Sequence, residues 1–251
     1  MRNLIIKIVV AITLCSSALV AQDNIDDVKI MTENWPPFNM MKDKKISGLA
    51  VEVLDAVLKQ MNSKLTKKDI KLLPWSRAYR SLQNKKNHML FSITRTEKRE
   101  NMFKWVGPIA DTSIDVVGLK SNKIKIDKAS DLNAYKTGAP KNSAPAQSLL
   151  SNGVDEKNII YKTNKDNILT SLKMIKKQRM HFFTENIKVM KYVAITNGIN
   201  FDDFELALNL KKAQLYFAFN KQTDDKIIKK YQDALDAIKK NGIYNKILSK
   251  Y

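Results

Sequence analysis

Residues 50–61 read AVEVLDAVLKQM, and their apolar side chains recur at the spacing of an amphipathic helix. Five of them stand at positions i, i+4, i+7, i+8 and i+11 and so share one face: Ala50, Leu54, Val57, Leu58 and Met61. Strand-like runs flank this helix at residues 28–32 and 70–73. A strand, a helix and a second strand in this order predict parallel pairing of the two strands, with the helix covering the sheet.

The same alternation continues along the chain. A helical stretch at residues 76–83 and a strand-like run at 88–93 complete a βαβαβ unit. Further strands are predicted at 114–119, 136–139, 159–161, 180–184 and 215–219, and further helices near 144–150, 167–176, 187–195 and 227–238. This order predicts an α/β protein of two lobes, each a mainly parallel sheet flanked by helices.

The composition is that of a globular protein with an unusual charge. Of its 251 residues, 44% are hydrophobic and 27% are charged, which excludes a disordered chain, a collagen-like fibre and a polytopic membrane protein. The formal net charge is +19, but only six of the 44 basic residues are arginine, and the 38 lysines are scattered among acids. Nucleic-acid readers use arginine heavily and cluster charge on one face. We therefore expect a solvated lysine-rich surface and no nucleic-acid partner.

The first 21 residues have the pattern of an export signal. Basic residues near the N-terminus precede an apolar run that ends at Cys15, and small residues offer cleavage sites after Ala18 or about Ala21. Lipidation of Cys15 is the less favoured alternative, because Leu14 precedes it where Gly, Ala or Ser is usual. We expect a cleaved signal peptide, a mature chain without cysteine and a soluble periplasmic protein.

Few residues suggest catalysis or metal binding. The two histidines, His88 and His181, fall inside strand-like runs, and the predicted mature chain has no cysteine to join them. The seven glycines form no phosphate-binding loop, and no nucleophile elbow or triad is present. We therefore expect no metal ligands, no cofactor and no catalytic residues.

Polar and aromatic side chains follow three strands of the first lobe. Trp35 follows the first strand, Trp75 follows the second, and the segment SITRTEKR, which begins at Ser92 and ends at Arg99, follows the third. Ligands of open α/β sheets bind beyond the carboxyl ends of the strands. We therefore expect these residues, Ser92 included, to meet in one ligand-binding cleft.

Three motifs carry a resemblance to a known family. TRTEKR at 94–99 is similar to a T-x-T-x-E-R segment, GLAVEV at 48–53 to G-F-x-V-D-L, and KNGIYNKI at 240–247 to D-G-T-Y-x-x-I. The motifs T-x-T-x-E-R, G-F-x-V-D-L and D-G-T-Y-x-x-I are those of family 3 of the bacterial extracellular solute-binding proteins, which the chain therefore resembles. This family includes the polar amino-acid-binding components of ABC transporters such as glutamine-binding protein. The resemblance covers essentially the whole mature chain. It implies the two-lobed fold of a type II periplasmic binding protein.

The resemblance also implies roles for residues of the first lobe. Arg99 stands where the family's arginine holds the ligand α-carboxylate, a task that suits its planar fork of donors. Thr94 stands at the threonine that hydrogen-bonds the ligand. Trp35 and Trp75 stand at aromatic positions that sandwich the ligand side chain.

Residues of the second lobe are implied in the same way. Asn142, Ser143 and Ala144 match a turn into a helix whose backbone N–H groups hold the carboxylate. Ser143 replaces the usual glycine of that turn. Glu185 corresponds to an aspartate that binds the ligand α-amine, and it is one methylene longer.

Two arginines depart from the family pattern. Arg77 stands two residues beyond Trp75, where common amino-acid binders have a small residue, and Arg95 replaces an apolar residue between two threonines. Arg77 is placed among the expected ligand-binding residues, whereas for Arg95 a surface position is slightly favoured. If both pointed inward, an anionic ligand would be favoured.

The resemblance implies a lobe organisation and partners. The first lobe is expected to comprise 22–112 plus 208–251 and the second 116–205, with hinge segments near 111–115 and 205–210. The implied partners are a small-molecule ligand, an amino acid or related carboxylate, and an inner-membrane ABC permease that recognises the closed form. We expect a monomer.

Two alternatives remain open on the same scaffold. One is a periplasmic enzyme similar to cyclohexadienyl dehydratase, for which Glu185 is the candidate general acid. The other is a sensory protein whose closed form docks onto a membrane receptor instead of a permease.

Overall fold

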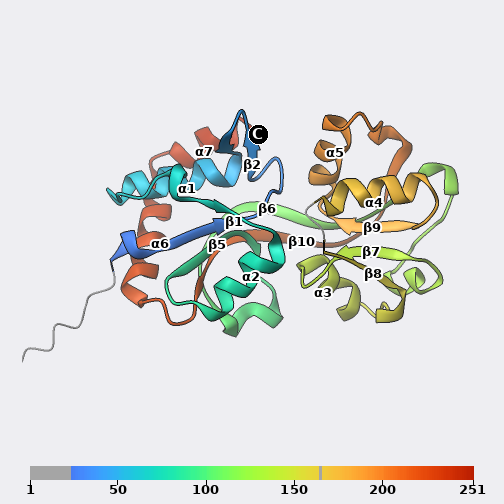
Figure 1. Cartoon of the computed structure of the whole chain (residues 1–251), viewed down its shortest axis with the longest axis horizontal. Coiled ribbons are helices and arrows are strands. Elements are labelled where there is room, and N and C mark those ends of the chain that lie inside the picture. Colours follow the sequence, from blue (N-terminus) through green and yellow to red (C-terminus); the bar gives the residue numbers. More distant parts are fainter. Residues whose placement is uncertain (1–23, 164–165) are drawn as a thin grey trace, which may run out of the picture.

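A mixed sheet of eight strands runs through both halves of the molecule (Figure 1). The structure is a computed structural model that describes residues 24–163 and 166–251, so the predicted signal peptide, with Cys15, lies outside the described residues. The strand order is β4-β1-β5-β10-β6-β9-β7-β8. The strands are β1 (Lys29–Thr32), β4 (Lys71–Leu72), β5 (His88–Thr94), β6 (Phe103–Leu119), β7 (Thr137–Pro140), β8 (Ile159–Lys162), β9 (Phe182–Glu185) and β10 (Phe204–Asn220).

The first half contains the predicted βαβαβ unit. Strand β1 pairs in parallel with both β4 and β5, and α1 (Leu49–Gln60) and α2 (Trp75–Asn84) connect these strands. The predicted face of α1 is buried, with Leu54 and Val57 fully inaccessible. It packs against α6 (Asp225–Lys240) and α7 (Ile243–Leu248), which return from the end of the chain. Each such aliphatic side chain contributes about 1.5–3 kcal/mol by leaving water.

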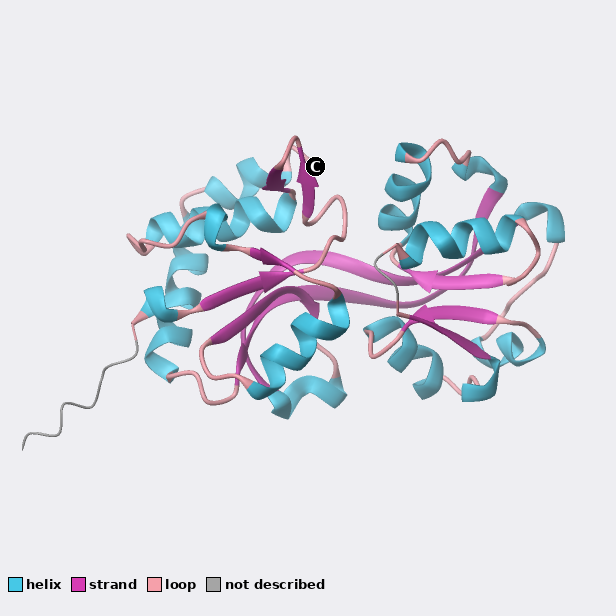
Figure 2. Cartoon of the chain, viewed as in Figure 1, coloured by secondary structure: helices cyan, strands magenta, loops and turns pink. Residues whose placement is uncertain are grey.

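The second half repeats the arrangement. Strand β7 pairs in parallel with β8 and β9. Figure 2 shows helices on both sides of these strands; they include α3 (Ala144–Ser151), α4 (Asn167–Lys176) and α5 (Ile187–Thr196). Leu149 of α3 and Leu172 of α4 are fully buried. The predicted class, an α/β protein of two lobes, is confirmed.

Two long antiparallel strands, β6 and β10, join the halves (Figure 1). Each has 17 residues, so the predicted strands at 114–119 and 215–219 are only their ends. Asp111 pairs with Gln214 and Asp115 with Asn209. The segment opposite 111–115 is therefore 209–214, a few residues later than the predicted 205–210, and both segments continue strands. The expected lobe boundaries themselves stay a prediction.

The structure adds a small hairpin that the sequence did not predict. Strands β2 (Met40–Lys42) and β3 (Lys45–Ser47) pair in antiparallel fashion just before α1. Their two-residue turn, Asp43-Lys44, has φ of 50° and 61°, which is the left-handed backbone of a tight hairpin turn. Asp43 is a favoured first residue of such a turn, but Lys44 stands where glycine is usual, so the residue pattern does not predict this hairpin. Within residues 24–163 and 166–251, no helix is long and apolar enough to cross a membrane.

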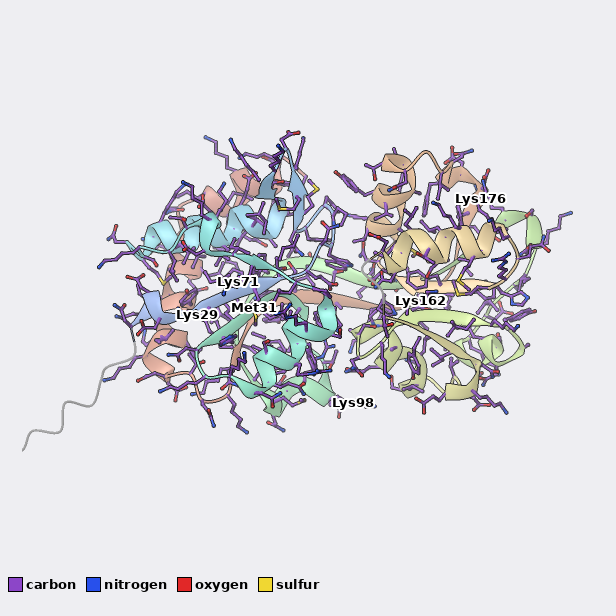
Figure 3. All side chains as sticks on the ribbon, viewed as in Figure 1. Lys29, Met31, Lys71, Lys98, Lys162 and Lys176 are labelled. Atoms are coloured by element: carbon purple, nitrogen blue, oxygen red, sulfur yellow. The ribbon has the colours of Figure 1, made fainter. Side chains whose placement is uncertain are left out.

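Lysines are distributed over both halves of the molecule. Figure 3 labels Lys29, Lys71 and Lys98 in the first half and Lys162 and Lys176 in the second. Some lysines form exposed ion pairs, such as Lys176 with Asp203 at 2.7 Å and Lys229 with Asp233 at 2.6 Å. Exposed ion pairs contribute about 0–1 kcal/mol each to stability. The many lysines are therefore mainly a feature of the protein surface.

Candidate ligand-binding site

A cavity of about 240 Å³ lies between the two halves. Its walls come from the carboxyl ends of β1, β5, β7 and β9 and from the starts of α2 and α3. That is the edge at which open α/β sheets bind ligands. Eight of the predicted ligand-binding residues line it: Trp35, Trp75, Ser92, Thr94, Arg99, Ser143, Ala144 and Glu185.

Arg99 is the buried cation of this cavity, with only 1% of its surface exposed. Its Nη1 donates to the carbonyl of Thr94 and its Nη2 to the carbonyl of Asn142, both at 3.0 Å. The guanidinium lies over the rings of Trp75 and Tyr79, 5.2 and 5.0 Å from their centroids. Its buried Nε has no hydrogen-bond partner among the described residues. Burial lowers the pKa of Arg99, and an anion in the cavity would offset that cost.

Hydrogen bonds across the cavity hold the two halves together. The carbonyl of Asn142, which precedes α3, accepts from Arg99 and from Trp75 Nε1 at 3.2 Å. A third bond joins Thr96 Oγ1 to Gln147 Oε1 of α3 at 3.0 Å. Asn142 has φ of 59°, a left-handed conformation that asparagine adopts more readily than most residues. Asn142 itself does not line the cavity, but its backbone carbonyl contacts Trp75 and Arg99, two residues of the other half that do.

The start of α3 presents few free amide groups. Ser143 Oγ accepts from Ala146 N at 3.2 Å as the helix N-cap and donates to the carbonyl of Pro140 at 2.6 Å. Pro145 has no N–H. The amide of Ala144 therefore remains for a ligand at this helix start. The resemblance implies more than one such amide.

Glu185 ends β9 and faces the cavity from the second half, with 7% of its surface exposed. Its Oε1 accepts from Asn186 N at 2.8 Å. Burial raises its pKa to about 7, and the neighbouring Asp115, opposite it in the β6–β9 register, adds to the increase. The Asn186 amide and the Trp35 indole act in the other direction.

A second carboxylate, Glu33, lines the cavity from the first half. It follows β1 directly. Burial raises the pKa of Glu33 to about 8; the charge of Glu185 adds to this, and Arg99 opposes it. The cavity therefore brings together two acids and one arginine from different parts of the chain.

Family comparison places the chain among known proteins. The model of the bacterial extracellular solute-binding proteins, family 3, matches residues 28–251. The chain belongs to this family. A relative in Bacillus subtilis (strain 168), described as a probable amino-acid-binding protein, YxeM, is 28% identical over 234 residues, covering 91% of this chain and 84% of the relative.

Several solved structures share the fold. An ancestral arginine-binding protein bound to glutamine has a TM-score of 0.74 and 21% identity, covering 89% of this chain and 96% of that one. A histidine kinase sensor domain has a TM-score of 0.77 and 17% identity, covering 89% and 95%. The protein EhuB in complex with hydroxyectoine has a TM-score of 0.75 and 19% identity, covering 89% and 87%. These similarities confirm the two-lobed fold of a type II binding protein.

Arg77 does not reach the cavity, so its predicted place among the ligand-binding residues is wrong. The side chain is exposed on α2 and borders a shallow surface hollow with Arg80 and Lys85. Two residues along a helix turn the side chain by about 200°. Trp75 and Arg77 therefore point away from each other.

Arg95 also faces outward. Its guanidinium pairs with Glu100 and lies over the rings of Trp105 and Tyr216, 5.6 and 5.5 Å from their centroids. Successive residues at the end of a strand point to opposite sides, so Thr94 faces the cavity and Arg95 does not. The argument for an anionic ligand, which needed both arginines inside, no longer holds.

The cavity wall includes residues that the sequence did not identify: Glu33, Asn34, Leu72, Leu73, Thr112, Ser113, Ile114, Lys141, Lys162, Thr163, Asn167 and Ile168. Glu33 had a usable signal, because it follows the same strand that led to Trp35. The β6 residues had none, because the predicted strand began at residue 114.

The pH dependence of stability should report on Glu33. A carboxyl group whose pKa is raised on folding binds protons more tightly in the folded protein, so stability falls as pH rises from about 4.5 to about 8. We expect Glu33→Gln to remove part of this fall, making the ligand-free protein about 1–3 kcal/mol more stable than wild type at pH 8.5 and little different at pH 4.5. Thermal unfolding of both proteins across this pH range measures the difference in stability. A difference that stays the same at every pH would contradict the expectation.

Proposed function

We propose that this protein captures an α-amino acid in the cavity between its lobes and delivers it to a membrane-embedded ABC permease. The observation that carries the proposal is the arrangement of Arg99 and Glu185 in the wall of one cavity between the two halves. A guanidinium suits a ligand carboxylate, and a buried acid suits an ammonium group. The Bacillus relative, described as a probable amino-acid-binding protein, supports the same ligand class.

The proposal includes a location and a cycle. The first 21 residues would direct export and be removed, and the mature chain would act in the periplasm as a monomer. Lobes at 22–112 plus 208–251 and at 116–205 would close over the ligand by bending β6 and β10 where they cross. The bonds from Trp75 and Arg99 to the Asn142 carbonyl support closure of this kind.

A thermal-shift screen tests the ligand class. Protein stripped of ligand by unfolding and refolding is heated with single amino acids, organic acids and polyamines. A ligand that binds only the folded protein raises the melting temperature by mass action. We expect α-amino acids to give the largest shifts. A screen in which organic acids or polyamines shift the protein and amino acids do not would overturn the proposal.

Glu185→Gln should weaken binding of the amino acid that shifts the protein most. The substitution keeps the size of the side chain but removes the charge that pairs with the α-amine, so the expected loss is about 1.5–3 kcal/mol. Calorimetric titration at pH 8, where most of the Glu185 carboxyl is ionised, gives the comparison. An affinity equal to that of wild type would place the ligand amine elsewhere.

A second candidate function is a periplasmic enzyme similar to cyclohexadienyl dehydratase. The observation that favours it is the pair of carboxyls in the cavity, Glu33 and Glu185, whose pKa values near 8 and 7 suit a general acid at neutral pH. Incubation of purified protein with prephenate or arogenate, followed by product analysis, separates the two candidates. Turnover that Glu185→Gln abolishes would establish the enzyme.

A further inference from the structure

Three hydrogen bonds run from the first half to one short part of the second half. Trp75 and Arg99 both donate to the Asn142 carbonyl, and Thr96 Oγ1 donates to Gln147 Oε1 at 3.0 Å. Asn142 precedes α3, and Gln147 lies in the first turn of that helix. The start of α3 is therefore held against the first half, where α2 and α3 face each other across the middle of the molecule (Figure 1).

The bond between Thr96 and Gln147 differs from the other two in its position. Trp75 and Arg99 line the ligand cavity, whereas Thr96 and Gln147 are not among the described residues of its wall. Thr96 borders instead a shallow hollow on the outer surface, together with the outward-facing Arg95. The bond therefore joins the two halves without contacting what the cavity holds.

The two side chains are not needed for local structure. Thr96 is the N-cap of the short 3₁₀ helix Glu97–Met102, a position where a threonine hydroxyl often accepts from a backbone amide. Its hydroxyl makes no such cap bond and is directed to Gln147 instead. The start of α3 has its own cap, because Ser143 Oγ accepts from Ala146 N. Removal of the Thr96–Gln147 bond therefore leaves both helix starts as they are.

We propose that Thr96 and Gln147 form an interlobe latch, which sets how tightly the protein holds any ligand but does not choose the ligand. The inference rests on the proposed function, in which the lobes open and close over an amino acid. A bond made only in the closed form stabilises that form equally for every ligand. Because the ligand-free protein of this cycle is mainly open, apparent affinity rises in proportion to the closed fraction.

The latch acts mainly on release of the ligand. In the proposed cycle the lobes close after the ligand has entered, so the Thr96–Gln147 bond forms after binding and breaks before dissociation. Loss of the bond should therefore raise the dissociation rate and leave the association rate nearly unchanged. A residue of the cavity wall, by contrast, affects each ligand according to the groups that it contacts.

Thr96→Val and Gln147→Ala each remove the latch and leave the residues of the cavity wall in place. Calorimetric titration compares them with the wild type, using each of the twenty standard L-amino acids that the wild type binds. We expect all of these affinities to fall by the same factor, about 2- to 10-fold, the range for one neutral hydrogen bond. Dissociation, followed by displacement with excess competitor, should become faster by a similar factor.

Three further variants separate the latch from a general weakening of α3. The double variant Thr96→Val/Gln147→Ala should bind no more weakly than either single variant, because each of these has already lost the bond. Thr96→Ser keeps the hydroxyl and should lose less than about 2-fold. Asn152→Ala is the matched control at the other end of α3, where Asn152 Nδ2 donates to the Ser148 carbonyl within the second half at 2.8 Å. It should bind as the wild type does.

The outcomes distinguish the latch from the proposed function. Wild-type affinity in a folded Gln147→Ala protein overturns the latch and leaves the proposed function standing. Losses that differ from one amino acid to another also overturn it, because a contact away from the ligand cannot change their ratio. Losses that add up in the double variant, or an equal loss in Asn152→Ala, show a general effect on α3 and overturn it too. If the wild type binds none of the twenty amino acids, the proposed function fails, and the latch with it.

Discussion

Arg99→Ala is expected to weaken binding of the preferred amino acid by about 2–5 kcal/mol. The ligand carboxylate would enter the same cavity without its buried cation, while Glu33 and Glu185 would remain as uncompensated acids. Arg99 Nε is buried and has no hydrogen-bond partner among the described residues. The other donors already bind the carbonyls of Thr94 and Asn142. The loss therefore combines the missing ion pair with a weaker contact between the lobes.

Two further variants, Arg99→Lys and Arg77→Ala, test whether the loss of affinity is specific to the guanidinium of Arg99. An ammonium group cannot bind two carbonyls and a carboxylate in the planar geometry of a guanidinium, so Arg99→Lys should recover only part of the affinity. Arg77→Ala removes an exposed arginine outside the cavity and should bind as wild type does. Calorimetric titration compares the proteins, and circular dichroism checks that each is folded. Wild-type affinity in a folded Arg99→Ala protein would contradict the carboxylate role.

The local pattern of the sequence was enough to predict most of the helices and strands of both halves. The spacing of Leu54, Val57 and Leu58 matches the buried face of α1, because side-chain periodicity follows directly from helix geometry. The crossing strands were harder. The middle of β10, around Lys211 and Lys212, is exposed where it passes between the lobes, so no alternation of apolar residues marks it as strand.

Part of the cavity wall also follows from the geometry of the predicted strands. Residues at the ends of parallel strands meet at one edge, and Trp35, Thr94 and Arg99 line the same cavity there, while their contact with a ligand stays a prediction. That rule does not say which way a side chain points after the strand ends. Arg95 faces outward, where it lies over Trp105 of β6 and Tyr216 of β10, and Tyr216 is far away in sequence.

Asp115 connects the crossing strands to the site. It lies in β6, is 2% exposed, and stands opposite Glu185 in the β6–β9 register. Its carboxylate accepts from Ser113 Oγ at 2.5 Å, from Asn209 Nδ2 of β10 at 2.6 Å and from Ile187 N at the start of α5 at 2.9 Å. One buried anion thus joins both crossing strands to the helix that follows Glu185.

Asp115→Ala is therefore expected to lower the free energy of unfolding by about 3–4 kcal/mol, because three donors lose a charged acceptor and the Ile187 amide at the start of α5 loses its partner. Loss of the charge beside Glu185 lowers the pKa of that acid and offsets a small part of the lost stability.

Asp131→Ala is the matched control, because the Asp131 carboxylate also accepts from two backbone amides, those of Asp127 and Lys128, but in exposed positions. This substitution should lower the free energy of unfolding by about 1 kcal/mol. Urea denaturation of both variants measures the difference. Equal losses for the two would mean that Asp115 stabilises the fold only as an ordinary surface cap does, and that the crossing strands are held to the second lobe by their backbone ladder and apolar packing instead.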